Sequence, residues 1–503
     1  MTSQVMVDIE ARGQRLGESL DPMRRSELGQ FFTPSQVAAF MADMFTITDR
    51  PARLLDPGGG VGSLTAAVAN RWQREGGGPL DVTTVEADPR LHDSLRQTMA
   101  DLGQVHELTG IVIEGDFIEW GAGHVSGLGA LAAPKFDLVV MNPPYRKIHS
   151  ASGERRTLAA VGIEVPNLYA GFVALAAELL DDNGQIVAIT PRSFTNGPYF
   201  RRFRSLLLDR VGLRQIHVFD SRDTAFADSD VLQENVILHG IRAERPTTVI
   251  VSSSRSVADP TTIRHVPYGE VVRPDDPESF VHITLDERSA EFARQILELP
   301  CRLPPLDLSV STGPVVDFRA REHLRQEPGN DTVPLIYPVH LREGTVVWPQ
   351  PGSKKPNALV RCEETERLLM PSGTYVVVKR FSSKEERRRI TATVVTADSL
   401  PGDMFAFENH LNVFHQAGHG VPDRLAFGLA AFLNTTTVDQ FFRQFNGHTQ
   451  VNATDLRNLR YPSLDELEAL GDAVKAGLQQ ENLDEIAAQL LPTFSMRVVA
   501  RST

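Results

Sequence analysis

The chain of 503 residues contains little cysteine and no long apolar segment. Its two cysteines, Cys301 and Cys362, are too few for a disulfide framework or a thiolate metal cluster. No run of 18 apolar residues occurs, and the polar start has no apolar core of a signal peptide, so we expect neither a membrane span nor secretion. The length predicts roughly two to four globular domains, with the cytoplasm as the default location.

Basic residues are also few relative to acidic ones, at 51 Lys and Arg against 64 Asp and Glu, so the formal net charge is −13. Taken alone, this excess of acid argues against a nucleic-acid partner, because binding phosphates requires a positive surface. Two stretches differ from the average: residues 191–214 hold six arginines and one aspartate, and residues 377–390 hold six basic and two acidic residues. The sequence therefore predicts a narrow basic surface on an acidic protein.

Short β-rich runs alternate with helical patterns between about residues 31 and 240, which is typical of βαβ units in a doubly wound α/β fold. The expected strands are 53–55, 82–85, 111–113, 137–141, 186–189, 216–219 and 236–238. A helix is expected before the first strand, with Thr33 as N-cap, Pro34 at the first helical position and Gln36 completing a capping box. A change in composition places a domain boundary near residue 300, followed by short β-like runs and by helices near 424–445 and 463–490.

The first strand ends in the glycine-rich loop Asp56-Pro57-Gly58-Gly59-Gly60-Val61-Gly62. Glycines at a strand-to-helix turn let the backbone approach a ligand, although an isolated match is as often a plain tight turn. Glu86 ends the second strand, 24 residues after Gly62, close to the spacing at which a carboxylate binds a ribose. Position 63 is serine and no Gly-Lys-Ser/Thr follows, so we expect a nucleoside cofactor without a nucleotide's phosphates.

Two further strand ends carry polar and aromatic residues. Asp116 and Phe117 follow the third strand and could bind an adenine by hydrogen bonding and stacking, although Asp116 alone would fit a solvated loop. Asn142-Pro143-Pro144-Tyr145 follows the fourth strand. The Asn142 side-chain oxygen and the Pro143 carbonyl could accept the hydrogens of an exocyclic amine, with both prolines stiffening the turn and Tyr145 stacking on the base. The alternative is a rigid Pro-Pro turn.

These motifs, in this order and with Gly29-Gln30-Phe31-Phe32-Thr33-Pro34 before them, resemble the S-adenosylmethionine-dependent DNA adenine-N6 methyltransferases of the gamma group, which includes TaqI-type enzymes. The resemblance covers residues 29 to about 240. It departs from the family at Gly58-Gly59 and Val61, where the family has Ala-Cys and Thr. It implies a Rossmann-like methyltransferase domain over residues 1–300 (core 29–240) and a mixed α+β target-recognition domain over 301–503.

The resemblance also implies roles for individual residues. The cofactor S-adenosyl-L-methionine would contact Phe32, Thr33, Pro34, Asp56, Pro57, Gly58, Gly60, Glu86, Asp116 and Phe117. Asn142, Pro143, Pro144 and Tyr145 would hold a target adenine extruded from the duplex. Phe226 is our choice for the aromatic on the other face of that base, with Phe219 as the alternative.

Segments 375–389 and 446–457 resemble the target-recognition region of the PstI/BsuBI-type subgroup. This favours site-specific duplex DNA as substrate, read mainly by the C-terminal domain, and a cognate restriction endonuclease as functional partner. Two other interpretations remain open. One is a methyltransferase acting on RNA or a protein glutamine, and the other is a non-catalytic DNA-specificity or defence protein with a decayed methyltransferase fold.

We expect no metal site and no second activity. His410, His415 and His419 have loose metal-like spacing but no nearby cysteine, and no His-Glu-x-x-His motif occurs. Pro300-Cys301 is similar to the nucleophile motif of cytosine-C5 methyltransferases, but it follows the catalytic region. No carboxylate and lysine cluster indicates a nuclease.

Overall fold

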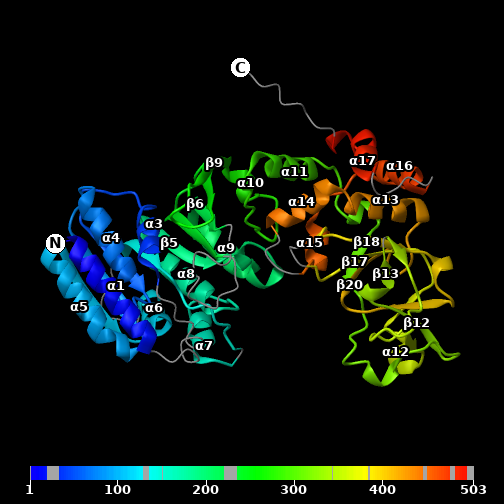
Figure 1. Ribbon diagram of the computed structural model, residues 1–503, viewed down its shortest axis with the longest axis horizontal. Helices are drawn as coiled ribbons and strands as arrows, with labels where there is room; N and C mark the ends of the chain where they lie inside the picture. Colours follow the sequence, from blue (N-terminus) through cyan, green and yellow to red (C-terminus); the bar gives the residue numbers. More distant parts are fainter. Residues whose placement is uncertain are drawn as a thin grey trace, which may run out of the picture. The chain divides into compact units, whose positions relative to one another are not determined.

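The computed structural model of the protein describes residues 2–19, 33–127, 135–149, 151–219, 235–342, 344–382, 386–445, 450–475 and 482–494. The chain forms two compact units, Met1–Leu285 and Asp286–Thr503 (Figure 1). The sequence placed the boundary near residue 300. The structure groups helix α11 (Glu287–Leu297) with the second unit, because Ala293 and Ile296 are buried in that unit's hydrophobic core.

The first unit is built on a nine-stranded sheet. In spatial order its strands are β3 (Leu108–Glu114), β2 (Leu80–Glu86), β1 (Ala52–Pro57), β4 (Phe136–Met141), β5 (Leu180–Pro191), β7 (Asn235–Arg242), β6 (Val211–Phe219), β8 (Thr248–Ser254) and β9 (Thr262–Pro267). All seven strands expected from the sequence are confirmed. β1 to β5 run parallel, whereas β7 is antiparallel to both β5 and β6, so the sheet is mixed rather than fully parallel.

Hydrophobic residues on both sides of each central strand give the sheet two buried faces. Leu54 of β1 packs in one core cluster and its neighbour Leu55 packs in the other, as expected where successive side chains point to opposite faces. Helices cover both faces, which confirms the doubly wound arrangement (Figure 1). They are α1 (Thr2–Ser19), α3 (Ser35–Ala42), α4 (Ser63–Arg74), α5 (Pro89–Val105), α6 (Phe117–Val125), α7 (Gly153–Ala160), α8 (Leu168–Leu179), α9 (Arg201–Arg210) and α10 (Tyr268–Val271).

The second unit combines β-sheets with a group of helices, as its composition predicted. One sheet has the order β10 (Ser309–Thr312), β20 (Leu411–His415), β17 (Tyr375–Lys379) and β18 (Ala392–Val395). The other has the order β11 (Leu324–Arg325), β15 (Ala358–Val360), β12 (Thr332–Ile336), β19 (Met404–Phe407) and β16 (Leu369–Pro371). A hairpin of β13 (Leu341–Arg342) and β14 (Thr345–Val346) contacts β18 of the first sheet.

Strand β17 contributes side chains to two hydrophobic clusters of this unit, because successive side chains point to opposite faces of its sheet. Val376 and Val378 pack in the core cluster that contains the helices, whereas Tyr375 and Val377 pack with Phe405 and Phe407 of β19. The helices are α11, the short α12 (Glu363–Glu366), α13 (Asp423–Leu433), α14 (Thr436–Phe445), α15 (Ala453–Asn458), α16 (Leu464–Lys475) and α17 (Leu483–Leu490). Among the residues described, no helix is both long and apolar enough to cross a membrane.

Candidate active site

The predicted site residues that the structure describes lie at or beside the carboxyl ends of strands in the large sheet. The strand order reverses between β1 and β4, and ligands of such sheets bind at the carboxyl ends of the strands where this reversal occurs. Leu55 of β1 pairs with Val139 of β4, so continuing the register places Gly58 level with Asn142. Pro57 pairs with Val85 of β2, which places Gly58 level with Glu86 as well. The strand ends bring the three motifs together.

The loop after β1 adopts a conformation that only glycine tolerates easily. Gly58, Gly60 and Gly62 have φ angles of 78°, 58° and 86°. A Cβ atom on Gly62 would lie 2.7 Å from Thr98 Cγ2. Val61, which replaces the family's threonine, is 2% exposed, so its side chain belongs to the packing beneath the loop. The loop is therefore a backbone surface open to a ligand.

Glu86 joins this loop to the end of β2. Its Oε2 accepts from the Gly60 amide at 2.8 Å, and its Oε1 accepts from the Asp88 amide at 2.8 Å. The side chain is 5% exposed, and burial raises the pKa of its carboxyl group. Each oxygen has a second lone pair, so a carboxylate held in this way can still accept from the hydroxyls of a ribose.

Asp56, at the end of β1, is fully buried. Thr65 Oγ1 donates to its Oδ2 at 2.7 Å, whereas Oδ1 has no hydrogen-bond partner among the described residues. Burial raises the pKa of Asp56 to about 7. A buried carboxylate with an unpartnered oxygen is costly unless a ligand supplies a donor or a positive charge. Asp56 therefore fits the cationic end of a ligand that lies over the glycine loop.

Asp116 and Phe117 lie where β3 passes into α6, and both side chains make contacts that the sequence did not predict. Asp116 is the N-cap of α6, and its Oδ1 accepts from the amides of Ile118 at 2.7 Å and Glu119 at 3.1 Å. Phe117 is 2% exposed, and its ring packs on Phe172 at 4.9 Å between centroids. Stacking of the Phe117 ring on an adenine is thus corrected, because the ring is part of the hydrophobic core.

Asn142 begins the Asn-Pro-Pro-Tyr turn directly after β4. Its Nδ2 donates to Thr33 Oγ1 at 3.1 Å, and its Oδ1 accepts from the Tyr145 hydroxyl at 3.2 Å. Pro143 is buried, whereas Asn142, Pro144 and Tyr145 are partly exposed. The apolar surroundings of Tyr145 raise the pKa of its hydroxyl, which keeps it a neutral donor. The turn therefore presents an amide whose orientation is fixed from both ends.

The bond to Asn142 also explains why the expected capping box is wrong. Helix α3 begins at Ser35 with Pro34 as its N-cap, and no side chain caps it. The Thr33 hydroxyl is used by Asn142 instead, so Thr33 belongs to the site rather than to the helix. Phe32, predicted beside it, lies outside the described residues.

The structure separates the two candidates for the second aromatic. Phe219, at the end of β6, is 3% exposed and packs against Phe40 and His217, so its ring is part of the core. Phe226, our first choice, lies outside the described residues and stays a prediction.

The arginines of 191–214 do not form the free basic surface that the sequence predicted. Arg210 pairs with Glu178 at 2.8 Å, Arg214 pairs with Glu244 at 3.0 Å, and Arg202 pairs with Glu164. Arg204 is fully buried and donates to the carbonyls of Phe194, Asn196, Gly197 and Glu278 at 2.7 to 3.0 Å. The sequence gives the number of these charges, but it does not show that they pair with carboxylates and carbonyls of other segments.

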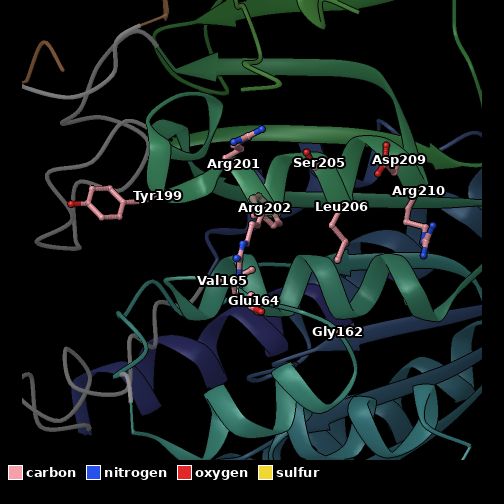
Figure 2. A pocket seen from close by; sticks show the side chains of 11 residues that line it. Gly162, Glu164, Val165, Tyr199, Arg201, Arg202, Ser205, Leu206, Asp209 and Arg210 are labelled. Atoms are coloured by element: carbon pink, nitrogen blue, oxygen red, sulfur yellow. Dashed lines mark ion pairs between the residues drawn. The ribbon is translucent and has the colours of Figure 1, made fainter. Parts of the chain in front are cut away.

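A groove of about 790 Å³ lies beside α9 and shows the same mixed charge. Arg202 and Glu164 face each other across it, and Tyr199 projects away from the other lining side chains (Figure 2). Tyr199 is 82% exposed. Its neighbour Phe200 packs on Tyr169 at 5.7 Å, and Tyr169 packs on Tyr145 at 6.2 Å, so ring contacts join this segment to the Asn-Pro-Pro-Tyr turn.

Arg204→Ala is expected to lower the free energy of unfolding by about 3 kcal/mol or more, because it leaves several buried carbonyls without donors. Arg202→Ala is the matched control: that side chain is 71% exposed, and the change should stay within about 0.5 kcal/mol. Chemical denaturation of both variants measures the difference. Equal stabilities would show that Arg204 does not hold this loop.

Comparison with known proteins agrees with this geometry. Residues 100–226 match the family described as Eco57I restriction-modification methylase. The chain is 44% identical over 472 residues to the type II methyltransferase M.BsuBI of Bacillus subtilis, covering 93% of this chain and 94% of that protein. It is 42% identical over 492 residues to the type II methyltransferase M.PstI of Providencia stuartii, covering 96% of each.

Among solved structures, the fold is similar to that of the type IIL restriction-modification enzyme MmeI in complex with DNA, with a TM-score of 0.51, 12% identity, and coverage of 97% of this chain and 75% of that one. The likeness to MmeI concerns the fold alone. The similarity to M.BsuBI and M.PstI extends over nearly the whole chain and confirms the predicted PstI/BsuBI-type resemblance. The chain belongs to the type II methyltransferases of restriction-modification systems.

Proposed function

We propose that this enzyme transfers a methyl group from S-adenosylmethionine to N6 of an adenine extruded from a specific duplex DNA sequence. It would act in the cytoplasm as the modification partner of a restriction endonuclease. The observation that carries the proposal is the Asn142 amide, held by Thr33 and Tyr145 at the strand edge that also carries the glycine loop. The names of the relatives M.BsuBI and M.PstI support it.

The residues at the strand ends fit S-adenosylmethionine. The buried Asp56 Oδ1, which has no partner among the described residues, would accept from the ammonium group of the cofactor. The backbone of the Gly58–Gly62 loop would lie against the methionine part, and the Glu86 carboxylate would accept from the ribose hydroxyls. The adenine of the cofactor would contact Asp116 and the backbone amide of Phe117 at the start of α6, rather than the Phe117 ring. When bound, the cofactor supplies a methyl group on a positively charged sulfur.

The Asn-Pro-Pro-Tyr turn would activate the target amine. The lone pair of adenine N6 is delocalised into the ring, so the amine attacks poorly until acceptors hold its hydrogens and favour a tetrahedral nitrogen. Asn142 Oδ1, which accepts from the Tyr145 hydroxyl in this structure, would be one acceptor for the amine hydrogens. The Pro143 carbonyl would be the second acceptor. Tyr145 would stack on the base and keep the nitrogen aimed at the methyl group.

Tyr145→Phe is expected to reduce the methylation rate roughly 3- to 10-fold, because it removes one hydrogen bond to Asn142 and keeps the ring. The cofactor affinity should not change. Tyr169→Phe serves as control, since it removes a neighbouring tyrosine hydroxyl that bonds to Ser193 instead. Steady-state rates on duplex DNA compare the variants, and a wild-type rate for Tyr145→Phe would show that the hydroxyl does not position Asn142.

The substrate class is tested by presenting the enzyme with labelled S-adenosylmethionine and equal amounts of unmodified duplex DNA, RNA and a protein fraction. Transfer to duplex DNA is expected, and protection of that DNA from a cognate endonuclease would support the modification role. Transfer only to RNA or protein would overturn the proposal. Binding of DNA without any transfer would favour the decayed, non-catalytic interpretation.

A further inference from the structure

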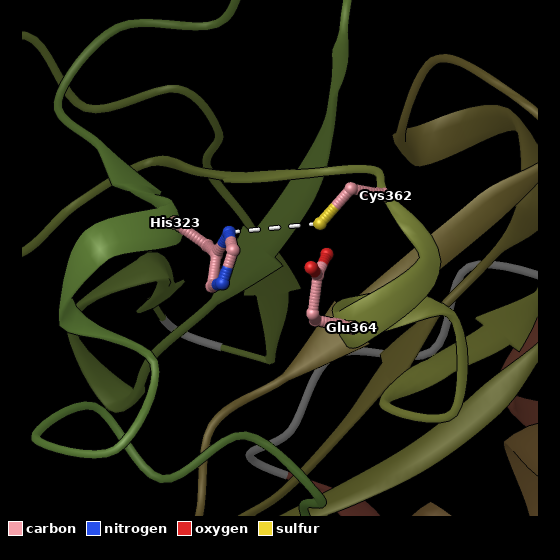
Figure 3. A group of neighbouring side chains, drawn as sticks. All are labelled: His323, Cys362 and Glu364. Atoms are coloured by element: carbon pink, nitrogen blue, oxygen red, sulfur yellow. Dashed lines mark hydrogen bonds between the residues drawn. The ribbon is translucent and has the colours of Figure 1, made fainter.

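Three side chains of the C-terminal unit, outside the methyl-transfer site, form a group with the donors of a metal site. His323 ends a short 3₁₀ turn at Arg321–His323, Cys362 directly precedes α12, and Glu364 lies in α12. One ligand atom of each lies within 4.8 Å of the others, and the imidazole, thiol and carboxylate face a common point (Figure 3). His323 Nδ1 and Cys362 Sγ are 3.6 Å apart.

The backbone brings these residues together although 39 positions separate His323 from Cys362. Strands β11 and β15 pair antiparallel, with Leu324 opposite Leu359, so His323 and Cys362 extend from the same end of the ladder. Thr365 fixes the second segment, since its hydroxyl donates to the Val360 carbonyl at 2.7 Å and accepts from the Cys362 amide at 3.0 Å. The pairing of β11 with β15 and the hydrogen bonds of Thr365 therefore hold the imidazole and the thiol close together.

The spacing matches what zinc requires. Zn²⁺ binds imidazole nitrogen at about 2.0–2.1 Å and thiolate sulfur at about 2.3 Å in a tetrahedral arrangement. From those bond lengths, the nitrogen and sulfur of a tetrahedral site should be about 3.5–3.6 Å apart, close to the separation here. Glu364 is exposed, so its side chain can rotate toward a metal without disturbing the core.

We propose that His323, Cys362 and Glu364 bind one Zn²⁺ ion, with water as the fourth ligand. Thiolate, imidazole and carboxylate are a donor set that zinc commonly takes in proteins. Binding ties the 3₁₀ turn before β11 to helix α12 and so braces one end of the sheet formed by β11, β15 and β12. The competing account is that Cys362 only makes ordinary hydrogen bonds, to His323 Nδ1 at 3.6 Å and to Thr365 Oγ1 at 3.5 Å, beside the start of α12. That account needs no metal.

Cobalt is the spectroscopic probe for this site. Purified full-length protein, treated with chelator and kept reduced, is titrated with Co²⁺. The proposal predicts one equivalent, visible absorption of tetrahedral Co²⁺, a thiolate-to-cobalt charge-transfer band in the near ultraviolet, and loss of both when Zn²⁺ is added. Zn²⁺ should also raise the unfolding temperature of the wild-type protein.

The second cysteine provides the matched control. Cys362→Ser should abolish the charge-transfer band, whereas Cys301→Ser, which changes the other partly exposed thiol, should leave it intact. His323→Ala removes a second ligand of the same site and should weaken Co²⁺ binding on the order of tenfold or more. No cobalt band in the wild type, or a band that survives Cys362→Ser, would overturn the proposal and leave Cys362 with ordinary hydrogen bonds only.

Discussion

Asn142→Ala is expected to abolish methylation of DNA, with a fall in kcat of at least about 100-fold, while the affinity for S-adenosylmethionine stays near that of the wild type. The substitution removes the oxygen that would accept from the target amine. The Asn142 amide bonds to Thr33 Oγ1 and to the Tyr145 hydroxyl, neither of which belongs to the glycine loop that would bind the cofactor. Single-turnover methylation measures the rate, and calorimetric titration measures cofactor binding.

A matched control for this variant is Asn183→Gly. Asn183 is exposed near the amino end of β5, at the opposite edge of the sheet, and its φ of 64° suits glycine. We expect wild-type rates for the control. If Asn142→Ala kept its methylation rate, the assignment of Asn142 would be wrong, and equal losses of rate and cofactor affinity would point to a collapsed site instead.

Asp56→Asn is expected to weaken S-adenosylmethionine binding roughly 10- to 100-fold, because a charge-assisted bond to the ammonium group contributes about 1.5–3 kcal/mol. The pH dependence is the sharper test. Asp56 has a pKa of about 7 in the folded protein, so its carboxylate is mostly protonated at pH 6 and mostly ionised at pH 8. The wild-type affinity should rise over that interval, and the variant should lose this rise.

Asp56→Asn should weaken cofactor binding but increase the stability of the cofactor-free protein at high pH. The pKa of Asp56 is raised from 3.8 in the unfolded chain to about 7 in the fold, so the folded state binds more protons between these values. Its contribution to stability is therefore present at low pH and is lost as the pH rises toward 7. We expect cofactor-free Asp56→Asn to unfold at a higher temperature than the wild type at pH 8. Asp81→Asn, which changes an exposed carboxylate of β2, should alter neither property.

Strand ends were predictable from the sequence because one short-range pattern sets them. A buried parallel strand needs a continuous apolar run, and a polar or glycine-rich residue ends it. Asp56, Glu86 and Asn142 were placed correctly at the carboxyl ends of β1, β2 and β4, and the sheet register brings them together. The antiparallel direction of β7 has no such local signal.

What the sequence could not supply was the partner of each side chain. Thr33 has the pattern of a helix cap, yet its hydroxyl accepts from Asn142, 109 positions away. Phe117 follows Asp116 as a stacking residue would, yet Phe172 of α8 covers its ring. Arg204 adds to a basic run, yet segments around 196 and 278 surround it with carbonyls. Each difference comes from a contact between distant segments, which composition and periodicity do not record.

Asn142 and the glycine loop would together serve methyl transfer to adenine N6 in duplex DNA. The direct measurement is incubation of the enzyme and S-adenosylmethionine with unmodified genomic DNA, followed by mass spectrometry of the nucleosides and mapping of the modified sites. The account predicts N6-methyladenine in one sequence context, formed by the wild-type enzyme and not by Asn142→Ala. Methylation of cytosine, or N6-methyladenine formed equally by the variant, would contradict it.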